Sequence, residues 1–168
     1  MKKLLFLILL AFGMSCNAGN LELVKGNTDC LKNAEVLMIA LDCSKATYMG
    51  EKDLDVFLKK ARRRKDWVEK SVDYFCEWFN DKTKRLVAEP LNKDGQFKLD
   101  IIVKDVQRSG RITAEIRLID TNTGNSEAVF LFKSSDGDNN DEITLRDPMK
   151  DAGETMGKYL RKVVEKAK

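Results

Sequence analysis

Few residues in this chain could carry out nucleophilic or acid–base chemistry. The chain contains no histidine, which excludes Ser-His-Asp and Cys-His catalysis and removes the commonest zinc ligand. What remains is a Ser-Lys pair, Ser44 and Lys45, at the end of a predicted buried strand, together with scattered carboxylates. Turn chemistry explains the Ser-Lys pair equally well. We therefore assign no catalytic residue from the sequence.

One acidic loop has the spacing of a metal site. Its oxygen-bearing side chains fall at positions used by an EF-hand calcium loop, namely Asp136, Asp138, Asn140, Glu142 and Asp147. The sharp turn of such a loop needs glycine where this chain has Asp141, and the preceding segment has the alternation of a strand. We interpret the segment as a polar connection and predict no metal and no cofactor.

The N-terminus has the pattern of an export signal. Two lysines precede an unbroken apolar run over residues 4–12, which small and polar residues follow. The run is too short to span a bilayer permanently. Cleavage after Ala18 would release a soluble protein, whereas cleavage before Cys16 would leave that cysteine for lipidation, although the residues before it match the lipoprotein motif imperfectly. Both routes predict a periplasmic, envelope-attached or secreted protein.

The remaining cysteines lack C-x-x-C spacing, so neither a zinc ribbon nor a thioredoxin-type site is indicated. Cys30 and Cys43 flank a predicted strand over 34–42, which spans about 30 Å when extended. This separates them too far for a disulfide unless the chain before the strand folds back. If the following helix returns along this strand, Cys76 comes near Cys30. We predict a Cys30–Cys76 disulfide, with three buried, unpaired thiols as the alternative.

Composition indicates one globular domain over residues 19–168, after a signal peptide over 1–18. Charged residues make up 34% and hydrophobic residues 43% of the chain, which is typical of a folded domain. Removing the two leader lysines lowers the formal charge from +3 to +1. The net charge therefore points to no nucleic-acid partner.

Hydropathy patterns predict an α+β fold, a two-layer sandwich of a mostly antiparallel sheet and two helices. Residues 34–42 are apolar on both alternations, as in a central strand, and 96–134 alternate as a three-stranded meander. Short strands are predicted at 21–25, 85–88 and 143–145, and a loop at 43–50. Helical periodicity covers 51–82 and 148–166, the second helix with Asp147 as N-cap and Pro148 as its first residue.

In the second helix Gly153 and Gly157 lie one turn apart beside the apolar stripe. Glycine destabilises a helix interior by about 1 kcal/mol relative to alanine. We therefore expect a close approach at these positions, of this helix to the sheet.

The helix over 51–82 carries two candidate binding features. Lys59–Lys65 contains six basic residues in seven, and these charges point to all sides of a helix, which favours a solvated bend over an anionic membrane surface. Trp67, Tyr74 and Trp78 form a stripe beside the apolar one. The stripe belongs to the core if buried, and forms a surface for a protein or glycan partner if exposed.

Several segments resemble small secreted or envelope α+β proteins of unknown function that are common in Bacteroidetes. The resemblance covers most of the mature chain and rests on four segments: LELVKGNTDCLKNAEVLMIALDCSKATY, VEKSVDYFCEWFND, AEIRLIDTNTGN and DAGETMGKYLRKVV. These are patterns of packing, so the resemblance implies a fold and export from the cytoplasm. It brings no catalytic residue.

Together these observations predict an exported, non-catalytic envelope or secreted module that binds a protein, or a glycan. One alternative is a small secreted hydrolase that uses carboxylates or Ser44 with Lys45. Another is a peripheral binder of anionic membranes through Lys59–Lys65. In the preferred interpretation the partner is an envelope or extracellular protein, and membrane contact comes only through a lipid anchor on Cys16.

Overall fold

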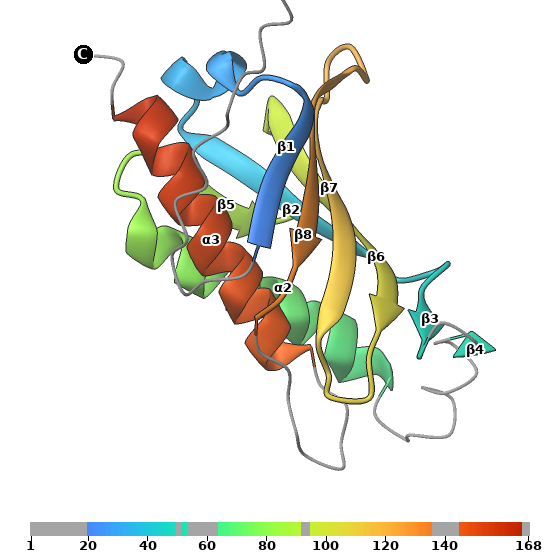
Figure 1. Ribbon diagram of the computed structural model, residues 1–168. Helices are drawn as coiled ribbons and strands as arrows, with labels where there is room; N and C mark the ends of the chain where they lie inside the picture. The colour runs from blue at the N-terminus through green and yellow to red at the C-terminus, as the bar shows by residue number, and fades with distance from the viewer. Residues whose placement is uncertain (1–19, 50–51, 54–63, 92–94, 136–144, 166–168) are drawn as a thin grey trace, which may run out of the picture.

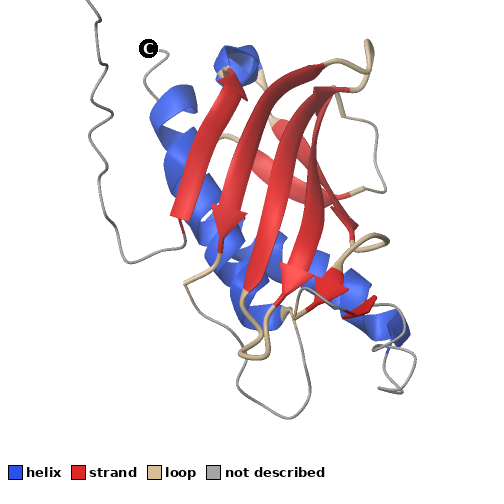
Figure 2. Cartoon of the chain, turned by 45° about the vertical axis from the view of Figure 1, so that its right-hand side comes forward, coloured by secondary structure: helices blue, strands red, loops and turns tan. Residues whose placement is uncertain are grey.

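Two helices lie on the same face of a mixed, mostly antiparallel sheet (Figures 1 and 2). The computed structural model describes residues 20–49, 52–53, 64–91, 95–135 and 145–165, and it describes 52–53 and 64–69 by their backbone alone. The elements are β1 (Asn20–Gly26), η1 (Asp29–Asn33), β2 (Val36–Asp42), β3 (Thr47–Tyr48), β4 (Lys52–Asp53), α2 (Arg64–Lys82), β5 (Val87–Pro90), β6 (Phe97–Val106), β7 (Ile112–Asp120), β8 (Ser126–Lys133) and α3 (Arg146–Val164).

The main strands lie in the order β1-β8-β7-β6-β2-β5. Hairpins join β6, β7 and β8 into the predicted antiparallel meander, and β1 pairs antiparallel with β8 as an edge strand. Strand β2 lies between β6 and β5 and is parallel to both. Three consecutive β2 residues, Leu37, Met38 and Ile39, are buried, so both faces of this strand are covered. The predicted α+β sandwich with an interior strand is confirmed.

Helix α2 returns the chain from the end of β2 to the start of β5. Parallel strands need such a crossover, and α2 therefore runs against the direction of β2. The Val87 N–H donates to the Glu35 carbonyl at 2.8 Å, so β5 begins beside the start of β2.

The core lies between the sheet and the two helices. Alternate residues of the meander strands point into it, and both helices add aromatic, methionine and leucine side chains. Its fully buried members include Phe75, Phe79, Leu99, Ile101, Ile116, Phe130, Phe132, Met149, Met156 and Leu160.

Two glycines let α3 pack closely against α2. A Cβ on Gly153 would lie closer to the Phe75 carbonyl oxygen than real Cβ atoms approach, and one on Gly157 would lie 3.0 Å from the Phe79 carbonyl oxygen. The close approach predicted for these glycines exists, but its partner is α2 and not the sheet. Because both contacts advance by one turn together, α2 and α3 run parallel.

The start of the first helix differs from the prediction. Lys52 and Asp53 form β4, which pairs antiparallel with β3, and β3 in turn pairs with β6. Helix α2 begins at Arg64. The predicted start at 51 is therefore wrong, because backbone pairing holds 52–53 extended, and residues 54–63 lie outside the described part of the chain.

The start of α3 also differs. Leu145 is the N-cap, and the helix begins at Arg146, so Asp147 and Pro148 lie within the first turn. The Met149 N–H already donates to the Leu145 carbonyl at 2.9 Å. Proline is tolerated at Pro148 because the first-turn N–H groups have no partner inside the helix. Of the predicted strand at 143–145, only Leu145 lies within the described residues.

Both outer edges of the sheet have features that oppose pairing with another strand. Strand β1 carries a register shift between Leu23 and Lys25, and its exposed side chains include Glu22 and Lys25. Strand β5 is only four residues long and ends in Pro90, which has no N–H to donate. Bulges, charges and proline are the usual protection of an edge strand.

Candidate binding surface

The aromatic residues of α2 divide between the core and the outside. Phe75 and Phe79 are fully buried against the sheet. Tyr74 and Trp78, one turn apart, are half-buried, and only Tyr74 packs against the core cluster. Of the predicted stripe, Tyr74 and Trp78 are therefore partly exposed at the surface. The side chain of Trp67 lies outside the described residues.

Basic residues of α3 lie over these two rings. The Arg146 guanidinium is 5.7 Å from the centre of the Tyr74 ring, and the Lys150 ammonium is 4.7 Å from the Trp78 ring. Lys82, one turn after Trp78, is 5.7 Å from the same ring. Cation–π contacts of this kind contribute about 0.5–1 kcal/mol at exposed sites. The parallel packing of α2 and α3 aligns the two α3 cations with the two rings.

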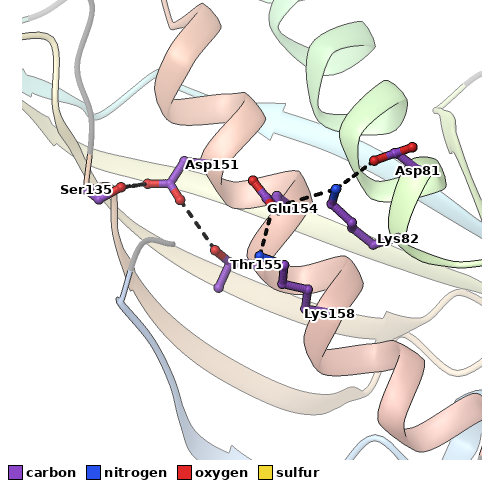
Figure 3. Close-up of polar contacts among 7 residues, drawn as sticks. All are labelled: Asp81, Lys82, Ser135, Asp151, Glu154, Thr155 and Lys158. Carbon is purple, nitrogen blue, oxygen red and sulfur yellow. Dashed lines mark hydrogen bonds and ion pairs between the residues drawn. The ribbon is translucent and has the colours of Figure 1, made fainter. Parts of the chain in front are cut away.

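A network of ion pairs crosses from α2 to α3 (Figure 3). Its central residue, Lys82, is the lysine that lies near the Trp78 ring. The Lys82 ammonium lies 2.6 Å from Asp81 and 3.7 Å from Glu154, and Lys158 lies 2.8 Å from Glu154. The hydrogen bond from Lys158, with help from Lys82, lowers the pKa of Glu154. The hydrogen bond to Asp81 raises the pKa of Lys82. In this network two lysines neutralise two carboxylates at the surface.

A hollow of about 440 Å³ opens beside the ring of Trp78, and its described lining consists of Glu77, Trp78 and Asp81. Two carboxylates beside an aromatic ring could suggest glycoside hydrolysis. A general acid, however, is usually buried in an apolar site that raises its pKa. Glu77 and Asp81 are exposed, and Asp81 already bonds to Lys82. The geometry therefore suits binding better than acid–base catalysis.

The Ser44-Lys45 pair lies in a solvated turn. The Ser44 N–H donates to Asp42 Oδ1 at 2.8 Å, and this bond lowers the pKa of the Asp42 carboxyl. Both Ser44 and Lys45 are exposed. A Ser-Lys mechanism needs a desolvated lysine to act as the base. The structure therefore gives the hydrolase alternative no support at this position.

The cysteines differ from the predicted pairing. Cys30 and Cys76 are free thiols. Their surroundings differ, since Cys76 lies near Glu89 of β5 and Cys30 near Glu127 of β8. Burial raises the pKa of Cys76 to about 12. Helix α2 does return along β2, but it packs against β5 as well, whereas η1, which carries Cys30, packs against α3.

A second polar cluster ties α3 to the end of β8. The buried Asp151 carboxylate accepts hydrogen bonds from the Ser135 N–H at 2.6 Å and from the Ser135 hydroxyl at 2.9 Å (Figure 3). Thr155 donates to the other carboxylate oxygen at 3.4 Å. The cluster was not predicted, because its two parts lie on different elements and no motif marks them.

Metal and membrane features fall largely outside the described residues. Of the candidate calcium ligands, only Asp147 lies among the described residues. In the described parts of the chain no three acidic, cysteine or histidine side chains gather in a metal-binding group. Of the basic run Lys59–Lys65, only the backbone of Arg64 and Lys65 is described, at the start of α2. No described helix has the length and apolarity needed to cross a membrane.

Comparisons with known proteins find similarity in the fold alone. No family model matches the chain, and no curated protein sequence matches it. Among solved structures, two forms of the PelC dodecamer from Paraburkholderia phytofirmans are 10% identical, with TM-scores of 0.47 and 0.46, and the alignments cover 86% of this chain and 96% of PelC. A DUF330 protein from Xanthomonas campestris is 12% identical with a TM-score of 0.39, over 77% of this chain and 82% of that one. These likenesses concern the arrangement of the chain and say nothing of what it binds.

Proposed function

We propose that the protein is an exported, non-catalytic module that binds another protein through the outer face of α2 and α3. The observation that carries this proposal is the position of Trp78, half-buried yet outside the core cluster, beside a hollow and between charged side chains. Tryptophan, tyrosine and arginine are the residues most enriched at the energetic centres of protein interfaces.

The surroundings of Trp78 favour a protein over a glycan. A sugar ring stacks on an open aromatic face, whereas two lysine ammonium groups already lie within 5.7 Å of the centre of this ring. Charged side chains of both signs surround it, including Glu77 and Lys150. Mixed charges around a central aromatic residue are typical of the rim of a protein interface.

The protected sheet edges also favour the helical face. A partner that adds a strand would need a regular, open edge. The register shift in β1 and the proline at the end of β5 oppose this mode of binding. The outer face of α2 and α3 is therefore the better candidate surface.

The binding proposal is tested by comparing one truncation on each face of the molecule. Trp78→Ala removes the ring from the helical face, and Leu131→Ala removes an exposed apolar side chain from the sheet. Each variant is produced in the cells of origin, treated with formaldehyde, and purified with its crosslinked proteins for quantitative mass spectrometry. We expect at least one crosslinked protein to be lost with Trp78→Ala and retained with Leu131→Ala. Identical crosslinking of both variants would contradict the proposal.

Export is tested by the intact mass of the protein from soluble and membrane fractions of the same cells. A mature chain that begins after Ala18, or a lipidated chain that begins at Cys16, would support export. A chain that retains its first residues in the soluble fraction would contradict it.

A further inference from the structure

We infer that the partner bound by this face is a second copy of the same chain, placed by a two-fold axis that runs along α2 and α3. The inference rests on the proposed function, because it uses the same surface and names its occupant. Three features support it, namely a row of like charges on each helix, the register between the two rows, and the area of the face.

The first feature is a pair of opposite charge rows. Asp73 and Glu77 lie one turn apart on α2 and are both exposed. Arg146 and Lys150 lie one turn apart on α3. Within the described parts of the chain neither row forms an ion pair, and the two cations contact aromatic rings instead. Like charges one turn apart destabilise a helix, so an opposing row of the other sign would relieve both helices.

The second feature is the register of the rows. Arg146 lies over Tyr74, the residue after Asp73, and Lys150 lies over Trp78, the residue after Glu77. The glycine contacts place the backbones of Arg146 and Lys150 toward the N-terminal side of these turns, and their long side chains bring the charged groups to the rings. Each acidic residue of α2 therefore has a cation of α3 over the ring that follows it in the sequence. The surface thus has an acidic side, an aromatic middle and a basic side at two successive turns.

Such a surface is complementary to itself under one symmetry operation. A two-fold axis that lies in the interface and runs along the helices exchanges the α2 side with the α3 side and keeps the height. Asp73 of one copy then faces Arg146 of the other, and Glu77 faces Lys150, each pair occurring twice. An axis across the helices would place the acidic rows against each other, so the charges select a single arrangement.

The next turn does not oppose this arrangement. Asp81 and Glu154 would meet across the axis, but both already lie beside Lys82, and Glu154 also pairs with Lys158. The rings of Tyr74 and Trp78 would lie near the axis, in the centre of the interface. Electrostatic matching of this kind fixes the orientation of a complex more than it raises the affinity.

The third feature is the size of the face. Each helix has 19 residues and is therefore about 28 Å long. With axes about 8–10 Å apart, the pair presents a face about 20 Å wide. Two such faces bury on the order of 1,100 Å², slightly above the roughly 1,000 Å² that a specific interface needs. We therefore expect a weak but specific dimer.

The experiment reverses one charge at a time and measures association by sedimentation equilibrium of the protein as its cells process it. Glu77→Lys and Lys150→Glu each replace two attractive pairs with two repulsive ones, so each variant alone should bind itself at least about tenfold more weakly than the native chain. An equimolar mixture of the two variants restores an opposite charge at both sites. The mixture should therefore dimerise as the native chain does.

The matched controls are Glu22→Lys on β1 and Lys133→Glu on β8, which make the same charge changes at exposed positions of the sheet. They should dimerise as the native chain does. A native chain that stays monomeric at all accessible concentrations, or a mixture that fails to recover dimers, would overturn the inference. If Trp78-dependent crosslinks to a different protein persist in that case, the proposed function stands and only the identity of the partner is wrong.

Discussion

Asp151 fixes the position of the first half of α3, which carries both cations of the proposed surface. Its buried carboxylate accepts two hydrogen bonds from Ser135 at the end of β8. A buried donor that loses its acceptor costs about 1–3 kcal/mol, and the partly buried Ser135 donors fall at the lower end of this range. Asp151→Ala should therefore lower the free energy of unfolding by about this amount. Asp151→Asn keeps an acceptor oxygen and should lose less.

Denaturant titration of both Asp151 variants would check this prediction. The slope of the free energy with denaturant should stay constant if the native fold is retained. Equal stability of Asp151→Ala and the native chain would show that the Ser135 hydrogen bonds contribute nothing measurable.

Glu154 should make a contribution to the free energy of unfolding that depends on pH. Its pKa lies below the ordinary value of 4.5 because Lys158 and Lys82 stabilise its carboxylate. A group with a lowered pKa stabilises the fold above its unfolded pKa and loses that effect as the pH falls through the folded value. The native chain should therefore exceed Glu154→Gln in stability at pH 7, and the difference should vanish in strong acid.

Urea titrations of Glu154→Gln across this pH range measure the effect, with Glu22→Gln as a control at an exposed position on β1. A difference that grows as the pH falls would contradict the assigned ion pairs.

Cys76 should be inert in the folded protein. Burial raises the pKa of its thiol to about 12, so almost none of it is thiolate at neutral pH, and thiolate is the reactive form. We expect iodoacetamide at pH 8 to leave Cys76 unmodified in the native state and to modify it after unfolding. Mass spectrometry measures the alkylation of Cys76 in the native and the unfolded protein. Recovery of a Cys30–Cys76 disulfide from the native protein would contradict the structure.

At the scale of elements, the packing of α2 against α3 aligns the aromatic and basic residues. Gly153→Ala would add a Cβ against the Phe75 carbonyl oxygen, which is backbone and cannot move aside easily. The gain in helix propensity is about 1 kcal/mol, and overpacking costs typically about 1–3 kcal/mol. We therefore expect net destabilisation and a displaced α3.

Gly157→Ala provides the comparison, because its Cβ would lie 3.0 Å from its neighbours and needs only a small shift. Thermal unfolding should rank the native chain and Gly157→Ala above Gly153→Ala. A stabilised Gly153→Ala would mean that the helices are further apart than the structure shows.

The main elements were predictable from the sequence because their apolar side chains recur at regular spacing. The meander alternates with period two, and 34–42 is apolar on both alternations because both faces of β2 are covered. Strands β3 and β4 have two residues each, too few for any alternation to appear. The start of α2 was missed for this reason, since backbone pairing at 52–53 leaves no trace in side-chain periodicity.

The candidate site was predictable only in part. Tyr74 and Trp78 stand out as a stripe because they share one helix. Arg146 and Lys150 come from a distant helix, and their alignment with the rings depends on how far α3 slides along α2. Gly153 and Gly157 signalled a close contact, but the sequence could not say whether its partner was the sheet or the other helix.

At the scale of the whole molecule, the two faces differ in what covers them. One face of the sheet packs on α2 and α3 (Figure 2). The outer side of these helices carries the aromatic and charged rows. The outward positions of the meander carry charged residues that pair locally, such as Glu115 with Arg117 and Lys98 with Asp100. Charges that pair with neighbours on the same strand are typical of a solvated face. We therefore expect a partner on the helical side.

The central claim, that the outer face of α2 and α3 binds protein, is tested most directly by a crosslinking amino acid placed on each face of the molecule in its own cells. We would place the photoreactive residue at Glu77 on α2 and, in a second variant, at Arg117 on β7; both positions are exposed. The account predicts a discrete protein adduct from position 77, weakened by Trp78→Ala, and none from position 117. A discrete adduct from position 117 with none from position 77 would contradict it.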